Sequence, residues 1–314
     1  MLIEFTVGLL AQAGGLIHPE TPPANPPAAS IESFAPPTPP DGPPASAEPE
    51  IFEATGRPLK TGLTVEDYAY EMPEGVTTSE VVYYSDGIAC YAKIFFPADF
   101  DPEAEPGVPA VVMGQGWAGS HISIEKYGAR FAEHGLVAMT IDYRGWGFSD
   151  GYPTVISLVD IGGGIARDES RHEVVEAEVW ERRTRLLPRD QQDDYRAAIS
   201  YIQGEPGVDP DRIGVWGSSF AGGNSVAVAG QDARVKAIAI QVPSVTGDPE
   251  GLEPVNLGGP LLADSIRRAR TGSGGEAWTG FSAPRLIDFE TFEALQFNNT
   301  MQWAANIGDR PFMV

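Results

Sequence analysis

A short turn between Gly217 and Ala221 carries the residue in this chain that is best suited to covalent chemistry. It reads Gly-Ser-Ser-Phe-Ala, and it separates an apolar run at 212–216 from a helix-like stretch at 224–230. A serine on a sharp strand-to-helix turn is exposed for nucleophilic attack, and small residues beside it permit the tight turn. The helix that follows favours negative charge at its N-terminus. We therefore predict that Ser219 is a nucleophile. The alternative is a Gly/Ser-rich loop without a catalytic role.

A second glycine-rich turn, Gly-Gln-Gly-Trp-Ala-Gly-Ser at 114–120, follows the apolar run at 109–113. Glycines let backbone N–H groups face a substrate oxygen, and two such donors stabilise the negative charge that develops on it during acyl transfer. We predict that the amides of Trp117 and Phe220 form this oxyanion hole. An ordinary strand-to-helix turn is the alternative.

The elements that must position these turns alternate between strands and helices. The pattern predicts two strands around a tight turn at 80–96, helices at 124–134 and 189–203, and short strands at 109–113, 136–141, 212–216 and 235–242. Such alternation indicates right-handed βαβ units. We predict an α/β fold with a mostly parallel sheet and helices on both faces. Its ligand site is expected at the carboxyl ends of the strands.

The strand at 136–141 ends in a third distinctive turn, Asp-Tyr-Arg-Gly-Trp-Gly-Phe-Ser-Asp-Gly at 142–151. We expect structural roles for its Asp142, Arg144 and Asp150. Taken with the two turns above and with Gln-x-Asp-Asp-Tyr-Arg-Ala-Ala-Ile-Ser-Tyr from residue 191, it resembles the α/β-hydrolase superfamily over about 81–242. The set looks closest to the dienelactone-hydrolase-like and X-prolyl-peptidase-like esterase branch.

This resemblance implies a serine hydrolase of the Ser–His–Asp type that acts on carboxylic esters or related acyl compounds through an acyl-enzyme on Ser219. It also places Trp117 and Phe220 at the oxyanion positions. Two residues depart from the pattern, because Gln115 stands where the family often has His and Ala221 where the elbow often has Gly. A non-catalytic binding protein on a degenerate hydrolase fold and an acyltransferase are the alternatives.

The histidine that should activate the serine is not where the resemblance places it. A serine hydroxyl needs a base, normally a histidine that a carboxylate orients, and in this superfamily the order is Ser, acid, His. All four histidines precede Ser219. Three of them have non-catalytic interpretations: His18 lies in the tail, His134 ends a helix, and His172 lies in an acidic segment.

Three explanations stay open. In the first, the chain stops within a buried strand that begins near Asp309, and the acid and the histidine lie beyond Val314. The chain as given would then be a nearly inactive fragment. In the second, His121, which follows the turn at 114–120, is the base. In the third, the base has been lost and the protein only binds. Within the chain, Asp248 and Asp288 are candidate acids, with a plain loop aspartate as the alternative.

Two insertions between the core strands, at 152–188 and 244–306, are expected to form a cap over the pocket. The first contains a helix-like charged run at 173–185, and the second is rich in glycine. Aromatic side chains of the second insertion would line an apolar acyl or alcohol site, or would only pack the cap onto the sheet. They are Trp278, Phe281, Phe289, Phe292 and Phe297.

The first 75 residues differ in amino-acid composition from the rest of the chain. Residues 1–18 form a tail or a weak signal segment, in which Glu4 stands where a signal peptide has positive charge. Residues 19–75 form a Pro-rich linker and lead-in, which we expect to be disordered. The hydrolase domain follows at 76–314. A cytoplasmic location is favoured over secretion or the periplasm.

Composition limits the partners. The chain has 44 acidic and 21 basic residues and a formal net charge of −23, which argues against binding to nucleic acid or to anionic lipid. No apolar run reaches the roughly 18 residues that a membrane span needs. The single cysteine, Cys90, excludes an internal disulfide and a cysteine-based zinc site, and we expect it to be buried and inert. We expect no cofactor and no metal, and a small acyl compound as the substrate.

Overall fold

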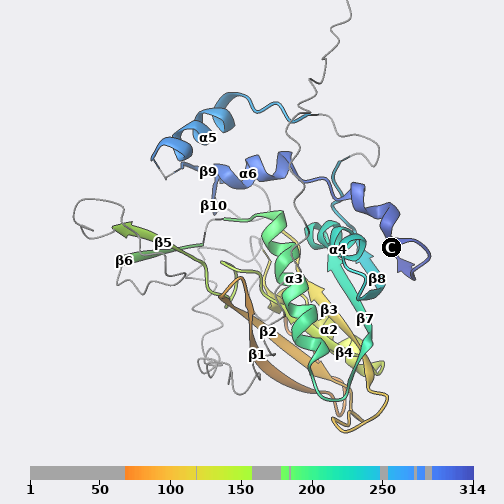
Figure 1. Ribbon diagram of the computed structural model, residues 1–314. Helices are drawn as coiled ribbons and strands as arrows, with labels where there is room; N and C mark the ends of the chain where they lie inside the picture. The colour runs from red at the N-terminus through yellow and green to blue at the C-terminus, as the bar shows by residue number, and fades with distance from the viewer. Residues whose placement is uncertain are drawn as a thin grey trace, which may run out of the picture. The chain divides into compact units, whose positions relative to one another are not determined.

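The computed structural model describes residues 68–314, apart from 118, 158–177, 184, 248–253, 272–273 and 280–284 (Figure 1). The chain divides into two units, 1–39 and 40–314, and every described residue belongs to the second. The predictions for 1–18 and for most of 19–75 therefore lie outside the described residues.

The core is a seven-stranded sheet in which the candidate site lies at one end of the parallel strands. The strand order is β1-β2-β4-β3-β7-β8-β11. The pairs β1–β2 and β2–β4 are antiparallel, and the other pairs are parallel. The strands are β1 (Thr77–Ser85), β2 (Ile88–Phe96), β3 (Val108–Gly114), β4 (Val137–Ile141), β7 (Val208–Ser218), β8 (Val235–Gln241) and β11 (Phe312–Met313). The predicted fold class is confirmed.

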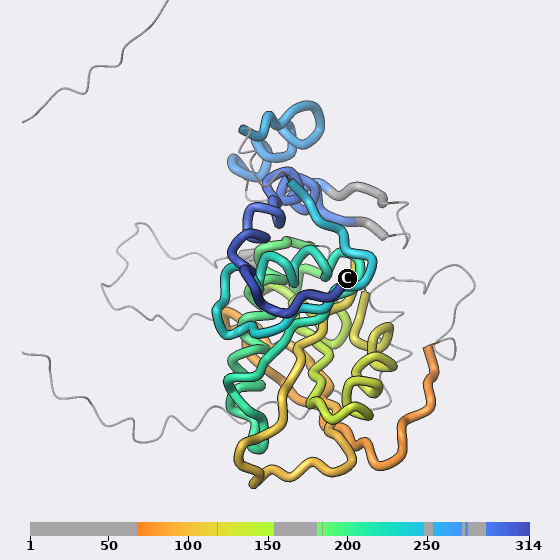
Figure 2. Tube along the Cα trace, turned by 90° about the vertical axis from the view of Figure 1, so that its right-hand side faces the viewer, coloured from red at the N-terminus to blue at the C-terminus, as the bar shows by residue number. Residues whose placement is uncertain are grey.

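Helices cover both faces of this sheet, and Figure 2 shows α2 and α3 on opposite sides of the strands. The helices are α2 (Glu125–Glu133), α3 (Pro188–Gln203) and α4 (Phe220–Gln231). Side chains of β3 pack alternately on the two faces of the sheet. Val111 and Met113 belong to one buried cluster, whereas Ala110 and Val112 belong to the other. A buried parallel strand is apolar throughout because successive side chains point to opposite faces.

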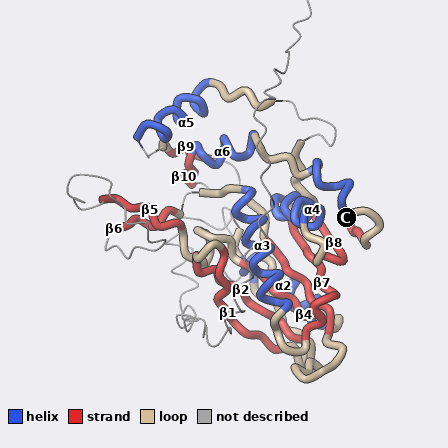
Figure 3. The backbone as a smooth tube through the Cα atoms, viewed as in Figure 1, coloured by secondary structure: helices blue, strands red, loops and turns tan. Residues whose placement is uncertain are grey.

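The first insertion corrects one of the predictions. β5 (Tyr152–Ser157) pairs antiparallel with β6 (Glu178–Arg182), and both are drawn as strands in Figure 3. The helix-like run at 173–185 is therefore wrong at 178–182. Charge spacing gave the helical pattern, but Val179 and Trp180 are residues that favour strands, and pairing with β5 satisfies their backbone groups.

The second insertion holds α5 (Gly259–Thr271), β9 (Glu276–Thr279), β10 (Arg285–Asp288), α6 (Phe289–Gln296) and the 3₁₀ helix η4 (Met301–Ile307). It contacts the first insertion directly. The Leu186 backbone N–H donates to the Thr291 hydroxyl at 2.9 Å, and Arg185 pairs with Glu290. No helix within the described ranges is both long and apolar enough to cross a membrane.

Residues near the end of the chain form a strand where the sequence predicts one. A strand does form after Asp309, because Phe312 and Met313 of β11 pair with Ile238 and Ala239 of β8. Phe312 is 45% exposed and Met313 is 62% exposed within the described part of the chain, so burial of this strand by further sequence stays a prediction. Among the described strands, β11 stands last in the sheet order, next to β8. Cys90 is fully buried as predicted, and burial raises the pKa of its thiol.

Candidate active site

Ser219 occupies the single residue between the end of β7 and the start of α4. Its backbone angles are φ 55° and ψ −117°, a conformation that non-glycine residues rarely adopt. Three backbone hydrogen bonds hold it there. The Ser219 N–H donates to the Gln241 carbonyl at 2.9 Å, and the Ser219 carbonyl accepts from Ser244 at 2.7 Å and from Gly222 at 3.0 Å. The end of β8 therefore supports the strained turn.

The small residues around Ser219 are required by close backbone contacts. A Cβ on Gly217 would lie 2.2 Å from the Ala221 carbonyl oxygen. A Cβ on Gly222 would lie 2.9 Å from the Cα of Pro243, and one on Gly223 would strike the Ser244 backbone. The prediction that small residues permit the tight turn is confirmed.

The glycine-rich turn after β3 lies against Ser219. A Cβ on Gly116 would lie 3.0 Å from the Ser219 Cβ and 3.5 Å from its Oγ. The Trp117 and Phe220 rings pack edge to face, with centroids 5.4 Å apart. Phe220 is the first residue of α4, so its N–H has no acceptor within the helix. Both residues predicted for the oxyanion hole thus come from segments that adjoin Ser219.

A buried hydrogen-bond network beneath the turn ties α3 and α4 to β7. The Tyr195 hydroxyl donates to the Trp216 carbonyl at 2.8 Å and accepts from the Ser225 hydroxyl at 3.2 Å. The Asn224 amide donates to Gln191 at 2.8 Å. Burial raises the pKa of Tyr195 to about 12. Sequence reasoning placed Tyr195 within the predicted helix at 189–203 without a role of its own, although Gln191 one turn earlier is a polar signal on the same helix face.

Arg144 and Asp194 form a second buried link, between the turn after β4 and α3. The Asp194 carboxylate accepts from the Arg144 Nε at 2.6 Å and from its backbone N–H at 3.0 Å. Another guanidinium nitrogen donates to the Tyr152 hydroxyl at 2.9 Å. Burial raises the pKa of Asp194 to about 6 against the opposing effect of Arg144. This geometry fits the structural role predicted for Arg144.

His121 contacts β2 and the turn that follows β4. It begins the 3₁₀ helix η3 (His121–Ser123), and its Nδ1 lies 2.6 Å from Oδ2 of Asp142, the residue that follows β4. Its ring packs on Tyr91 of β2, at a centroid distance of 4.5 Å, and on Phe148, at 5.0 Å. In the sheet, β4 and β7 lie on either side of β3. Within the described residues, Ser219 is not among the contacts of His121.

Two of the remaining candidates, His134 and Asp288, have other structural surroundings within the described residues. His134 is the C-cap residue of α2. Asp288 precedes α6 and pairs with Arg182 at 3.7 Å. Asp248 and His172 lie outside the described residues. In the second insertion, Phe292 packs against the core, whereas Phe297 is 59% exposed.

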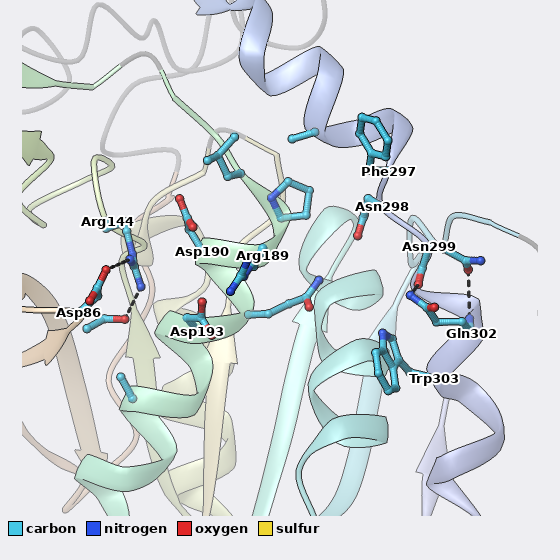
Figure 4. Close-up of a pocket in the computed structure, with 16 residues that line it drawn as sticks. Asp86, Arg144, Arg189, Asp190, Asp193, Phe297, Asn298, Asn299, Gln302 and Trp303 are labelled. Atoms are coloured by element: carbon cyan, nitrogen blue, oxygen red, sulfur yellow. Dashed lines mark hydrogen bonds and ion pairs between the residues drawn. The ribbon is translucent and has the colours of Figure 1, made fainter. Parts of the chain in front are cut away.

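A cavity of about 880 Å³ lies between the start of α3 and residues 294–303 (Figure 4). Arg144, Asp190 and Asp193 lie on one side of it, and Asn299 and Trp303 on the other. Its lining is mainly polar, and Ser219 is not part of it.

Comparison with known proteins places the chain in a family. The model of the X-Pro dipeptidyl-peptidase (S15) family matches residues 86–253, just over half of the chain. The chain belongs to this family. The matched range includes the turn at 114–120, the turn at 142–151 and Ser219. The sequence-based resemblance to the α/β-hydrolase superfamily is thereby confirmed.

Individual relatives are more distant. The quorum-quenching protein AidA of Acinetobacter baumannii (strain MDR-ZJ06) is 28% identical over 169 residues, which are 54% of this chain and 44% of AidA. The acyltransferase drtE of Aspergillus calidoustus is 32% identical over 131 residues, which are 41% of this chain and 33% of drtE. The chain thus spans less than half of the length of either protein.

Among solved structures, the α/β-hydrolase GrgF of Penicillium sp. sh18 matches with a TM-score of 0.55 and 20% identity. The match covers 75% of this chain and 78% of GrgF. This likeness supports the α/β-hydrolase fold.

Proposed function

We propose that the protein is a serine hydrolase that acts on carboxylic esters or related acyl compounds through an acyl-enzyme on Ser219. The observation that carries the proposal is the strained backbone of Ser219, with the turn at Gly116 packed against its side chain. A strained serine between a strand end and a helix N-terminus, beside backbone donors, is an arrangement suited to acyl transfer.

The reaction would proceed in two steps. The Ser219 Oγ attacks the acyl carbonyl carbon and gives up its proton to a general base, and the carbonyl oxygen becomes an oxyanion that the Trp117 and Phe220 amides stabilise. Collapse of this intermediate breaks the bond to the alcohol, which leaves with a proton. Water then attacks the acyl-enzyme, releases the acid and restores the Ser219 hydroxyl. The family resemblance implies a histidine base that a carboxylate orients.

Acyl transfer is a second candidate, because the same acyl-enzyme yields a new ester or amide when an alcohol or amine replaces water. The relative drtE, which is named as an acyltransferase, favours this candidate. A binding role without catalysis is the third, and Ser219 would then have no effect on any turnover.

The test uses the full-length protein, in which any acid and base beyond Val314 are present, and measures turnover of p-nitrophenyl acetate together with intact-mass detection of one acetyl group on the protein. Ser219→Ala should lower kcat by on the order of 10⁴–10⁶ and abolish the acetyl adduct. Ser218→Ala, the adjacent serine in the same turn, is the matched control and should retain both. If Ser219→Ala turns over as fast as the wild type, the nucleophile assignment is wrong. Adding an alcohol or amine acceptor and analysing the products separates transfer from hydrolysis.

A further inference from the structure

A buried charged cluster adjoins the turn at 114–120, and the proposed reaction does not use it. His121 is 1% exposed, and its two ring nitrogens face two carboxylates. Nδ1 lies 2.6 Å from Oδ2 of Asp142, and Nε2 lies 3.5 Å from Oε1 of Glu125. Neither Nε2 nor that Glu125 oxygen has a hydrogen-bond partner within the described part of the chain. A neutral imidazole donates from one nitrogen only, so an imidazolium fits this position better.

The groups around His121 balance its charge. The other Glu125 oxygen, Oε2, accepts from Lys93 of β2 at 2.9 Å and from the Tyr70 hydroxyl at 2.8 Å. Tyr91 of β2 contributes a ring contact to His121. Two carboxylates, Lys93 and a protonated His121 give a neutral cluster, whereas a neutral His121 leaves one buried negative charge uncompensated. An uncompensated buried charge is strongly destabilising.

This cluster is joined to the turn that lies against Ser219. Asp142 Oδ1 accepts from the His121 backbone N–H at 2.7 Å, and Oδ2 also accepts from the Phe148 N–H at 2.9 Å. His121 directly follows the turn at 114–120. The Asp142 carboxylate therefore binds the end of that turn through both the main chain and the His121 ring. Gly116, in the same turn, packs on Ser219.

We propose that His121, as an imidazolium between Asp142 and Glu125, is a positioning residue that holds the turn at 114–120 against Ser219. The inference rests on the proposed function, because the turn supplies the Trp117 oxyanion donor. A donor displaced by about 1 Å costs on the order of 10²-fold in rate. The loss falls on kcat more than on KM, since the oxyanion forms only on the way through the transition state.

The first experiment compares kcat and KM of the wild type with His121→Gln, which keeps the backbone N–H but cannot bridge both carboxylates. We expect kcat for p-nitrophenyl acetate to fall about 10- to 100-fold, with a smaller change in KM. His134→Gln, at the exposed end of α2, is the matched control and should leave kcat unchanged. If Ser219→Ala abolishes turnover but a folded His121→Gln variant keeps an unchanged kcat, the inference is overturned and the proposed function is not. If Ser219→Ala has no effect, the proposed function fails, and the inference fails with it.

The second experiment requires no turnover and no loss of the histidine. In ¹⁵N-histidine NMR, both His121 ring nitrogens should show imidazolium shifts at pH values above about 6.5, the ordinary histidine pKa. Glu125→Gln removes one negative charge, so the cluster becomes neutral with an uncharged His121, and the imidazolium signal should move to lower pH. A His121 that is neutral at pH 7 in the wild type, or that Glu125→Gln does not affect, overturns the inference.

Discussion

Substituting Gly217 by alanine should displace the nucleophile without removing any functional group. The new Cβ would lie 2.2 Å from the Ala221 carbonyl oxygen and 2.5 Å from the Ser225 hydroxyl, whereas Cβ contacts shorter than 3.0 Å essentially never occur. The carbonyl must therefore retreat by about 0.8 Å. Because this oxygen belongs to the backbone of α4, the first turn of the helix and the adjoining Ser219 must move with it.

Two magnitudes follow from that displacement. Overpacking of a tight core site costs about 1–3 kcal/mol of unfolding free energy, and a catalytic group misplaced by about 1 Å costs on the order of 10²-fold in rate. Urea denaturation and p-nitrophenyl acetate turnover measure the two effects. Gly258→Ala is the matched control, since a Cβ there meets nothing within 4 Å. If Gly217→Ala matches Gly258→Ala in both assays, the steric account of the turn is refuted.

Other perturbations test the supports of the site. Tyr195→Phe leaves the buried Trp216 carbonyl without its donor and should cost about 1–3 kcal/mol in a urea titration; an unchanged midpoint would contradict the network. Arg144→Met leaves the Asp194 carboxylate buried and unpaired, and should cost about 3–5 kcal/mol. Adding Asp194→Asn should recover part of that loss, and a fully additive double mutant would contradict a direct pair. Burial lowers the pKa of His121, but its two carboxylate neighbours outweigh burial and raise the pKa above the ordinary 6.5. The stability that His121 contributes should therefore be complete below about pH 6.5 and be lost as the pH rises through the folded-state pKa. Unfolding midpoints of the wild type and His121→Gln across that range should converge at high pH, and a constant difference would contradict the shift.

The sequence predicted the parts of the fold that short-range physics determines. The strands β3, β4, β7 and β8 are short runs rich in apolar residues, and the first three end in turns that contain glycine, so their existence follows from local pattern. The turn at Ser219 was equally visible, because only small residues allow its backbone contacts. The hairpin of β5 and β6 was missed at β6, since pairing with a distant strand overrides helix-like charge spacing.

Contacts between separate turns were beyond the reach of sequence reasoning. The pairing of His121 with Asp142 joins residues from the loops after β3 and β4, and no spacing rule connects them. His121 was therefore a candidate base for Ser219 on the grounds of sequence position alone. The structure shows His121 in contact with Asp142 and Glu125, and its role as a base for Ser219 stays an untested prediction.

The main-chain contacts between 217–223 and 241–244 also bear on how new selectivity is obtained in this scaffold. The two stretches contact each other through backbone atoms, so no side chain at this contact can be replaced to change selectivity. Sequence variation has to be introduced in segments that do not form these backbone contacts. Library design would keep both stretches fixed, including Ser244, and would exchange the insertion at 152–188 and the rest of the insertion at 244–306. The exchanged loops would then change the substrate range while Ser219 keeps its geometry.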